Sequence, residues 1–328
     1  MTNQDPAAAQ AGFDEAFRAS VLEGLTGAVK TADPKHFYDA EGSRLFDRIC
    51  TLPEYYPTRT ETAILTRHAS EMARAIETVM QRRGGPDGAR DMALLELGAG
   101  SSVKVRRLLG AMPELRCYIP LDISADHLAA SAALLEADHP GLEVRPVEGD
   151  FTGALNLPAD LEDCPKALFF PGSTIGNFDP DAARDLLARM RALKGAGAFL
   201  IGIDLVKDAD VLVRAYDDAQ GVTAAFNRNL LKRFNAELGA NFDLSSFDHE
   251  SRWNAAESRV EMHLVSRKRQ SVAIAGQRIE FEAGESIHTE NSYKYSVEGF
   301  ERLAKEAGWH PERHWSDPED LFAVHLLA

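Results

Sequence analysis

The chain has 328 residues, with 36 basic and 51 acidic side chains and a formal net charge of −15. Proteins that bind DNA or RNA usually present a basic surface, so this balance argues against a nucleic-acid partner. Hydrophobic residues make up 45% and charged residues 27%, which is typical of a globular protein with one large or two medium domains.

Cysteine usage and the N-terminus bear on the compartment. Cys50, Cys117 and Cys164 are scattered and lack metal-ligand spacing, and an odd number argues against a disulfide framework. A reducing cytoplasm is therefore the expected compartment. The N-terminus lacks the pattern of a signal peptide, and no apolar run is long enough to span a bilayer. We expect no membrane partner and a monomer.

The first part of the chain predicts helices around an aromatic-rich loop. Five apolar residues recur at helical spacing, namely Phe13, Phe17, Val21, Leu22 and Leu25. Residues 35–59 are rich in aromatics and prolines and predict a structured loop. A helix is expected to follow over about residues 60–79.

Short apolar runs then alternate with helical segments. Strands are expected at residues 92–97, 118–122, 142–147, 167–171 and 198–205. Ser101 or Ser102 and then Ser124 are expected to cap helices, and Asp179-Pro180 opens another. This alternation predicts an α/β fold with a doubly wound, mostly parallel sheet.

After the fifth predicted strand the pattern changes. Residues 209–238 predict a long helix, and alternating apolar residues around Ala275-Gly276-Gln277 predict an antiparallel hairpin. Ser296 then begins a helix, and residues 321–327 form a last strand.

A glycine turn, Glu96-Leu97-Gly98-Ala99-Gly100, follows the first predicted strand. Strand, Gly-x-Gly and helix form a nucleotide-binding arrangement, because glycine admits the ligand and the helix N-terminus supplies free N–H groups. The dinucleotide fingerprint has a third glycine, and Val103 stands in its place. The turn therefore favours S-adenosylmethionine over a pyrophosphate such as that of NAD.

Two further acids strengthen this interpretation. Asp122 ends the next strand, where it could accept both ribose hydroxyls. After the third strand, Asp150 could meet the adenine amine and Phe151 could stack on the ring. This order of motifs is found in class I methyltransferases, whose last strand is reversed. The plainer alternative is a turn that packs a helix on a sheet, with Asp122 as a helix cap.

Six stretches resemble the histidine Nα-methyltransferases of ergothioneine biosynthesis. They are Phe37-Tyr38-Asp39-Ala40 with Gly42-Ser43, residues 52–60, residues 96–104, Gly172-Ser173-Thr174-Ile175-Gly176-Asn177, residues 204–229 with Tyr216-Asp217-Asp218, and Thr289-Glu290-Asn291-Ser292. The similarity runs over nearly the whole chain from about Phe13. One departure is visible, since the family often reads Ser-x-Lys-Phe where this chain has Ser292-Tyr293-Lys294-Tyr295.

The resemblance implies that three methyl groups pass to the α-amine of free L-histidine, which gives hercynine. It implies that Asn177 and Tyr216 hold the carboxylate, and that Tyr38 lies beside the amine as the catalytic residue. The remaining substrate candidates hold or line the imidazole pocket, and they are Tyr55, Met262, Glu290 and Ser292. The candidate cofactor residues, from the turn and the resemblance, are Glu96, Gly98, Gly100, Lys104, Asp122, Asp150 and Phe151.

The family fold also implies two lobes. We expect a cofactor domain from residues 61–206 and 296–328, and a substrate lobe from residues 12–60 and 207–295. Methyl transfer from a sulfonium needs alignment and no metal, and none is expected because His36, His249, His263 and His288 show no ligand spacing. Aromatic faces stabilise a quaternary ammonium product, and the candidates are Phe37, Tyr38, Phe46, Tyr55 and Tyr56.

Several alternatives stay open. The substrate could be another amine such as tryptophan, because related enzymes act on tryptophan or prenylated tryptophan and lack the Glu290 and Ser292 pair. An NAD-dependent dehydrogenase and a non-enzymatic binding protein are the other classes. Plainer roles also exist for single residues: Glu290 as a solvated charge, Asn177 as a turn residue and Met262 as core.

Overall fold

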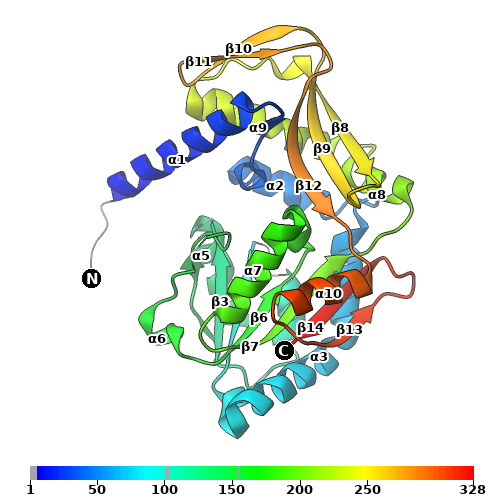
Figure 1. Cartoon of the computed structure of the whole chain (residues 1–328). Helices are drawn as coiled ribbons and strands as arrows, with labels where there is room; N and C mark the ends of the chain where they lie inside the picture. The colour runs from blue at the N-terminus through cyan, green and yellow to red at the C-terminus, as the bar shows by residue number, and fades with distance from the viewer. Residues whose placement is uncertain (1–5, 101–102, 124, 154) are drawn as a thin grey trace. The chain divides into compact units, whose positions relative to one another are not determined.

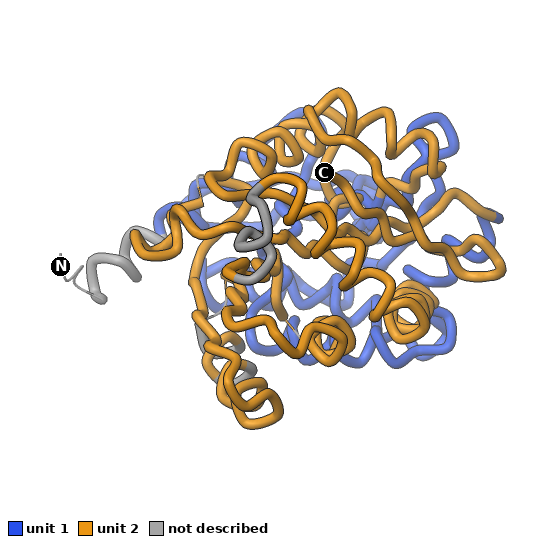
Figure 2. Tube along the Cα trace, turned by 90° about the horizontal axis from the view of Figure 1, so that it is seen from below, with its two compact units in different colours: residues 1–55, 208–292 blue, residues 56–207, 293–328 orange. Residues whose placement is uncertain are grey.

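The computed structural model describes residues 6–100, 103–123, 125–153 and 155–328. The chain divides into two compact units, which Figure 2 colours separately. Unit 1 comprises residues 1–55 and 208–292, and unit 2 comprises residues 56–207 and 293–328. The predicted breaks lay after residues 60, 206 and 295, close to the observed ones. The assignment of a substrate role and a cofactor role to the units stays a prediction.

Unit 2 is built on one sheet with strand order β13-β14-β7-β6-β2-β3-β4, and β5 also pairs with β3 (Figure 1). Its strands are β2 Ala93–Leu97, β3 Cys117–Asp122, β4 Glu143–Val144, β5 Val147–Glu148, β6 Lys166–Phe170, β7 Ala196–Asp204, β13 Pro311–Ser316 and β14 Phe322–Leu327. The strands from β7 to β4 pair in parallel, and β14 runs antiparallel to both of its neighbours. The predicted mostly parallel sheet with a reversed last strand is confirmed.

Helices cover both faces of this sheet because its strands are apolar on both sides. They are α3 Tyr56–Arg90, α4 Val103–Leu109, α5 Ala125–Asp138, α6 Ala159–Glu162, α7 Pro180–Ala192 and α10 Val297–Glu306. Leu94 of β2 belongs to a buried cluster with residues of α3, α4 and α5. Leu95 belongs to a second cluster with residues of α7 and α10. The sheet is therefore doubly wound, as predicted.

The local signals in unit 2 have mixed outcomes. Ser296 caps α10 through a hydrogen bond from the Gly299 N–H (3.0 Å), as predicted. Helix α3 is longer than the predicted 60–79. The expected strand at 142–147 is split into β4 and β5 around Pro146, which cannot donate to a sheet ladder. The predicted caps Ser101, Ser102 and Ser124 lie outside the described residues.

Unit 1 contains a four-stranded sheet and a separate hairpin. The sheet order is β1-β12-β9-β8, and the hairpin pairs β10 with β11. The strands are β1 Lys30–Thr31, β8 Phe247–Asn254, β9 Arg259–Ser266, β10 Gln270–Ile274, β11 Gln277–Phe281 and β12 Ser286–Tyr293. The predicted hairpin is confirmed, because Ala275 (φ 47°) and Gly276 (φ 81°) give the two left-handed residues of a tight hairpin turn.

The helical part of unit 1 differs from the prediction in two places. Its helices are α1 Pro6–Thr26, η1 Pro34–Phe37, α2 Ala40–Ile49, α8 Ala209–Tyr216, α9 Val222–Leu238 and η3 Leu244–Ser246. The expected loop at 35–59 contains α2, which Asp39 caps by accepting the Gly42 N–H (2.7 Å). The single helix expected at 209–238 is broken before α9, where the N-cap Gly221 is left-handed (φ 70°) and the Asp218 carboxylate accepts the Val222 and Thr223 N–H groups.

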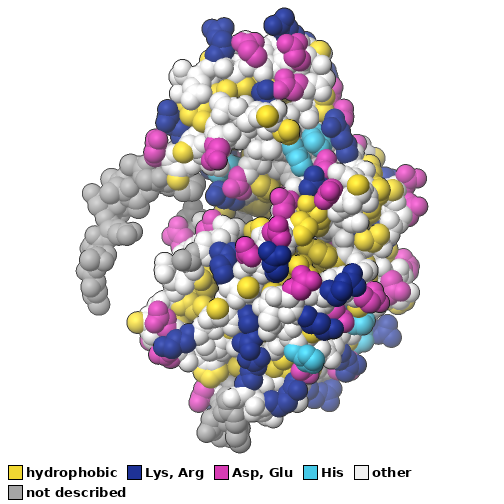
Figure 3. Space-filling view, viewed as in Figure 1, with side chains coloured by type: hydrophobic (Ala, Val, Ile, Leu, Met, Phe, Trp, Pro, Cys, Tyr) yellow, Lys and Arg dark blue, Asp and Glu magenta, His cyan; other side chains and the backbone are white. Residues whose placement is uncertain are grey.

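Charged side chains of both signs are spread over the surface. On the face shown in Figure 3, basic side chains lie among acidic ones. Within the described residues, no helix combines the length and the apolar character that crossing a bilayer requires.

Candidate active site

The glycine turn lies in unit 2, directly after β2. Gly98 has a left-handed φ of 69°, and the N–H groups of Gly98 and Ala99 both donate to the Leu121 carbonyl, at 2.8 and 3.0 Å. A Cβ on Gly98 would lie 3.6 Å from the ring of Phe151. A Cβ on Gly100 would meet no atom of the described residues within 4 Å. The backbone at Gly100 is therefore open to a ligand.

The neighbouring strand ends bring the two candidate acids to the same edge of the sheet. The carbonyl of Asp122, at the end of β3, accepts the Gly149 N–H at 3.0 Å. Asp150 is exposed and accepts the Thr152 N–H at 2.8 Å. Phe151 is half-buried and packs edge-on against Phe170, with ring centroids 5.3 Å apart. Ligands of open α/β sheets bind at this carboxyl edge.

Glu96 is buried beneath the turn and accepts a hydrogen bond from the Tyr118 hydroxyl. Burial raises its pKa to about 8, although the hydrogen bond from Tyr118 and the charge of Lys104 act in the opposite direction. Burial also raises the pKa of Tyr118 well above its ordinary value. Glu96 is thus largely protonated near neutral pH. It is held by its hydrogen bond to Tyr118, a residue of β3.

This protonation predicts a pH effect on stability. The pKa of Glu96 is about 8 in the folded chain and near 4.5 when solvated. Between these values the folded state holds the extra proton, so the free energy of unfolding falls as pH rises. Glu96→Gln cannot titrate, so its Tm should fall less than that of the wild type between about pH 5 and pH 8. Thermal unfolding across this pH range measures the change in Tm, and Glu114→Gln at an exposed position is the control. Equal slopes of Tm against pH in Glu96→Gln and the wild type would contradict the protonation of Glu96.

Lys104 is held by a buried partner that the sequence analysis did not identify. Its Nζ lies 2.7 Å from Oε2 of Glu61, whose side chain is fully buried. Both carboxylate oxygens of Glu61 also accept the Gly172 N–H, at 3.0 and 2.9 Å. Glu61 therefore fixes Lys104 against the start of the Gly172–Asn177 segment. The sequence signal for this role is a charged residue among the buried positions of α3.

The Gly172–Asn177 segment has an unusual backbone. Gly172 (φ 87°) and Ser173 (φ 57°) are consecutive left-handed residues, and such a conformation costs free energy for serine. The Ser173 hydroxyl accepts the Asp204 N–H at 2.9 Å, which helps to hold it. A Cβ on Gly176 would lie 2.7 Å from the Tyr293 carbonyl, so glycine alone fits there. The segment ends at half-buried Asn177, in η2 Thr174–Asn177.

Asp204 ends β7 and is the centre of a buried charge network. Its carboxylate oxygens lie 2.7 Å from Lys294 Nζ and 2.5 Å from Lys207 Nζ. They also accept a hydrogen bond from the Tyr56 hydroxyl, at 2.7 and 2.8 Å. Burial by itself would raise the pKa of Asp204, but Lys294 and Lys207 hold it below the usual range. The network joins the segments around residues 56, 204 and 294. The lysine of the Ser-x-Lys motif thus has a buried anchor.

The candidate substrate residues other than Asn177 belong to unit 1, where aromatic rings form a chain. Tyr38 packs edge-on against Phe46 (5.7 Å), Phe46 against Tyr55 (6.3 Å) and Tyr55 against Tyr216 (6.1 Å). Burial, aided by Tyr216, Cys50, Glu290 and Tyr38, raises the pKa of Tyr55 well above its ordinary value. The Tyr55 hydroxyl therefore stays protonated and neutral.

The tyrosines of this chain of rings lie near the substrate candidates on β12, Glu290 and Ser292. The Tyr216 hydroxyl and Ser292 Oγ lie 2.6 Å apart, and both side chains are buried. Glu290 is 9% exposed and is close enough to influence the pKa of Tyr55. The plainer interpretation of Glu290 as a solvated charge is therefore wrong. Tyr38, Tyr55, Tyr216, Glu290 and Ser292 are brought together from four separate stretches of chain.

Met262 lies on β9, the strand beside β12, and is 2% exposed. Its carbonyl accepts a hydrogen bond from Thr289 Oγ1 at 3.0 Å, which ties the two strands together. The structure places Met262 in the buried face of unit 1, so its plainer role as a core residue also holds.

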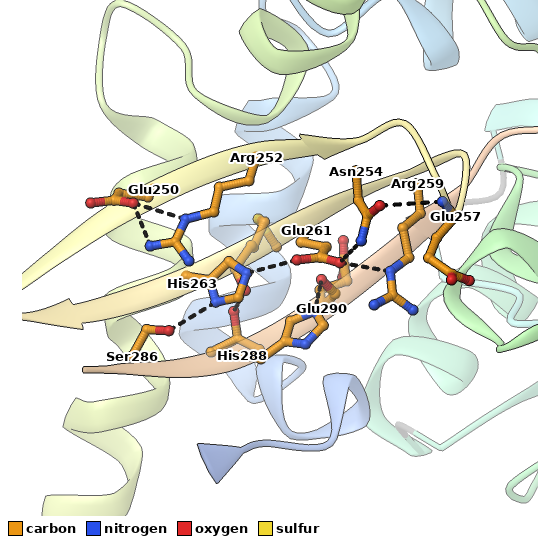
Figure 4. A network of polar contacts seen from close by, with 12 residues as sticks. Glu250, Arg252, Asn254, Glu257, Arg259, Glu261, His263, Ser286, His288 and Glu290 are labelled. Atoms are coloured by element: carbon orange, nitrogen blue, oxygen red, sulfur yellow. Dashed lines mark hydrogen bonds and ion pairs between the residues drawn. The ribbon is translucent and has the colours of Figure 1, made fainter. Parts of the chain in front are cut away.

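Figure 4 shows a polar network around β9 and β12, next to Glu290. Glu261 accepts hydrogen bonds from Arg259 (2.8 Å) and Asn254 (2.9 Å), and its other oxygen lies 3.1 Å from His263 Nε2. The ring of His263 stacks on His288 at 4.6 Å. His288 Nε2 in turn lies 3.1 Å from the Glu290 carbonyl. The network therefore helps to fix the backbone that carries Glu290.

The aromatic candidates for a cation site are only partly brought together. Phe37 is fully buried and stacks on Phe226 at 4.5 Å. Tyr56 belongs to unit 2, where its hydroxyl donates to Asp204. Phe226 of α9 was not predicted, yet its ring lies 5.9 Å from Tyr38 and 6.1 Å from Phe46. Helical spacing could not distinguish it from an ordinary core residue.

A family model of histidine-specific, S-adenosylmethionine-dependent methyltransferases matches residues 17–328. The chain belongs to this family. The protein is thus an S-adenosylmethionine-dependent methyltransferase, and its doubly wound sheet with the reversed β14 is the class I methyltransferase fold. This contradicts the alternatives of a dehydrogenase and a non-enzymatic binding protein.

Individual relatives of the methyltransferase are similar over nearly the whole chain. The histidine N-alpha-methyltransferase of Mycolicibacterium smegmatis is 44% identical over 96% of this chain and 95% of its own. The enzyme of the same name from Mycobacterium tuberculosis is 41% identical over 95% of each chain. The 4-dimethylallyltryptophan N-methyltransferase of Aspergillus fumigatus is 28% identical over 97% of this chain and 95% of its own.

The departure from the family's Ser-x-Lys-Phe pattern lies in unit 2. Tyr295 packs edge-on against Phe300 at 5.7 Å, and its N–H donates to the Asp204 carbonyl at 3.1 Å. The ring of Tyr295 therefore packs beside α10, and its buried hydroxyl has no hydrogen-bond partner among the described residues.

Proposed function

We propose that this methyltransferase transfers three methyl groups to the α-amine of L-histidine and forms hercynine, the intermediate of ergothioneine biosynthesis. The observation that carries the proposal is the burial of Glu290, Ser292 and Tyr216, with the hydroxyls of Ser292 and Tyr216 lying 2.6 Å apart. A carboxylate and a hydroxyl can satisfy both nitrogens of an imidazole. The identity of 44% to a histidine N-alpha-methyltransferase supports the same substrate.

The proposed substrate roles follow from the residue types. Glu290 accepts the imidazole N–H, and Ser292 bonds the other nitrogen. Tyr55 and Met262 line the same pocket. Asn177 and Tyr216 hold the carboxylate of histidine, and Tyr38 lies beside the amine. A site built to hydrogen-bond its substrate rejects analogues that lack the matching group, because its own buried polar atoms are then left unpaired.

The proposed cofactor roles lie in unit 2. S-adenosylmethionine supplies the methyl group from its sulfonium when it is bound. The glycine turn at Gly98 and the open backbone at Gly100 admit this ligand, and Asp122 holds the ribose hydroxyls. Asp150 and Phe151 bind the adenine. Lys104, fixed by its contact of 2.7 Å with Glu61, completes the set. Glu96 supports the turn from beneath through Tyr118.

The reaction also requires that the α-amine lose a proton and that the cationic product be stabilised. The α-amine of histidine reaches the enzyme largely protonated, so an acceptor or solvent takes its proton before transfer. Tyr38 orients the amine or a water, because an ordinary tyrosine, with a pKa near 10, is a weak base. The trimethylated product is a quaternary ammonium, which aromatic faces stabilise by roughly 0.5–2 kcal/mol. Tyr38, Phe46 and Tyr55 supply such faces. We propose a cytoplasmic, monomeric enzyme whose chemistry needs no metal.

A mass assay tests this function. The protein is mixed with S-adenosylmethionine and an equimolar pool of free amino acids, and the products are read by mass spectrometry. We expect histidine to gain one, two and finally three methyl groups, while tryptophan stays unmodified. Preferred methylation of tryptophan would instead support the alternative that the 4-dimethylallyltryptophan enzyme represents. Histidine that stops at one methyl group would contradict trimethylation alone.

A further inference from the structure

A group of polar side chains in unit 2 has no part in the proposed reaction. It consists of Glu301 on α10, His314 on β13 and His325 on β14. His314 and His325 are directly opposite each other in the antiparallel pair, so their side chains project from the same face. Their ring centroids are 5.3 Å apart, and Glu301 Oε1 lies 3.8 Å from His314 Nδ1. The possible ligand atoms of all three residues lie within 4.8 Å of one another.

His325 is the unusual member of this group. Its side chain is fully buried, packs on Phe300 at 5.0 Å, and has no hydrogen-bond partner for either ring nitrogen among the described residues. A buried polar group without a partner costs free energy. Native proteins seldom tolerate this cost. A ligand that binds one of the nitrogens would remove part of it.

The other group of this kind in the described residues is Glu261, His263 and His288. Its members already have protein partners, as Figure 4 shows. His263 is in contact with Glu261 at one nitrogen and Ser286 at the other, both at 3.1 Å. Glu261 also accepts a hydrogen bond from Arg259 at 2.8 Å. The positive charge of Arg259 disfavours a metal ion at this place. The comparison favours the group in unit 2.

We propose that Glu301, His314 and His325 form a site for a divalent transition metal ion, with Zn²⁺ as the best fit. Two imidazoles and one carboxylate are a common zinc donor set, and water fills the fourth position. Imidazole nitrogens disfavour Mg²⁺ and Ca²⁺, which prefer oxygen ligands. In a tetrahedral site, bonds of about 2.1 Å place the ligand atoms roughly 3.4 Å apart. The Glu301 and His314 side chains are 29% and 41% exposed, and the proposal requires them to change rotamer to reach this separation.

The site would link α10 to the edge strand β13 and to its neighbour β14. Metal binding to the folded chain alone stabilises that state. The expected consequence is therefore a more stable unit 2, independent of methyl transfer and of the proposed substrate.

The test uses the full chain without an affinity tag, stripped with a chelator and then titrated with ZnCl₂. Calorimetry should show one Zn²⁺ per chain, and the Tm should rise by a few degrees at saturation. His314→Ala and Glu301→Gln should each weaken zinc affinity at least tenfold. His310→Ala removes an exposed histidine just before β13 and should bind as the wild type does.

Three results would overturn the proposal. The first is no zinc binding by the wild type, and the second is unchanged zinc affinity in both His314→Ala and Glu301→Gln. The third is loss of zinc binding in His263→Ala, because that result would place the ion in the group of unit 1. Circular dichroism confirms that each variant is folded. Because His314 and Glu301 are partly exposed, their substitutions should leave the core intact.

Discussion

Glu290→Gln should lower kcat/KM for histidine by about 10- to 150-fold, which corresponds to the loss of a charged hydrogen bond worth about 1.5–3 kcal/mol. The side chain is 9% exposed and lies beside Tyr55, so solvent cannot replace the missing charge. The proposed imidazole contact would be made both before and during methyl transfer. The loss should therefore appear mainly in KM for histidine, with a smaller change in kcat.

Steady-state kinetics with histidine varied and S-adenosylmethionine saturating measures this effect. The affinity for S-adenosylmethionine should stay unchanged, because the proposed cofactor residues belong to unit 2. Glu280→Gln is the matched control, since it changes an exposed glutamate of β11 in the same unit. Unchanged histidine turnover in Glu290→Gln, or a preference of the wild type for another amino acid, would refute the histidine assignment.

Asp204→Ala should destabilise the protein by about 3–5 kcal/mol, because it leaves a buried cation without its partner. The Lys294 side chain is fully buried and lies 2.7 Å from Asp204, and Lys207 is 8% exposed. The Tyr56 hydroxyl would also lose its acceptor. The corresponding fall in Tm is roughly 6–20 °C.

Thermal and urea unfolding measure this loss, and two further variants separate charge from packing. Asp204→Asn keeps an acceptor for Tyr56 and removes the charge, so it should lie between the wild type and Asp204→Ala. The pair Asp204→Leu and Lys294→Met removes both partners and should cost less than the sum of the single changes. Asp185→Ala alters an exposed acid. A loss for Asp204→Ala no larger than that for Asp185→Ala would show that the network is not stabilising.

Features that depend on residues close together in the chain were predictable. The turn at Gly98, the proline-led start of α7, the Ser296 cap and the hairpin at Ala275-Gly276 each depend on a few adjacent residues. The alternation of apolar runs and helices was enough to predict a doubly wound sheet. Local competition caused the errors. Asp39 caps α2 within the predicted loop. The Asp218 carboxylate accepts the first N–H groups of α9, so the predicted single helix is two.

The sequence by itself determined the fold class, the cofactor turn and the family to which the chain belongs. Only the tertiary structure paired Glu61 with Lys104, Asp204 with Lys294, and His314 with His325. The reason is physical. Caps and turns are fixed by neighbours along the chain. Partners separated by tens of residues come into contact only when strand register and helix packing bring them together. Burial then strengthens their charge interactions and hydrogen bonds, because the local dielectric is low.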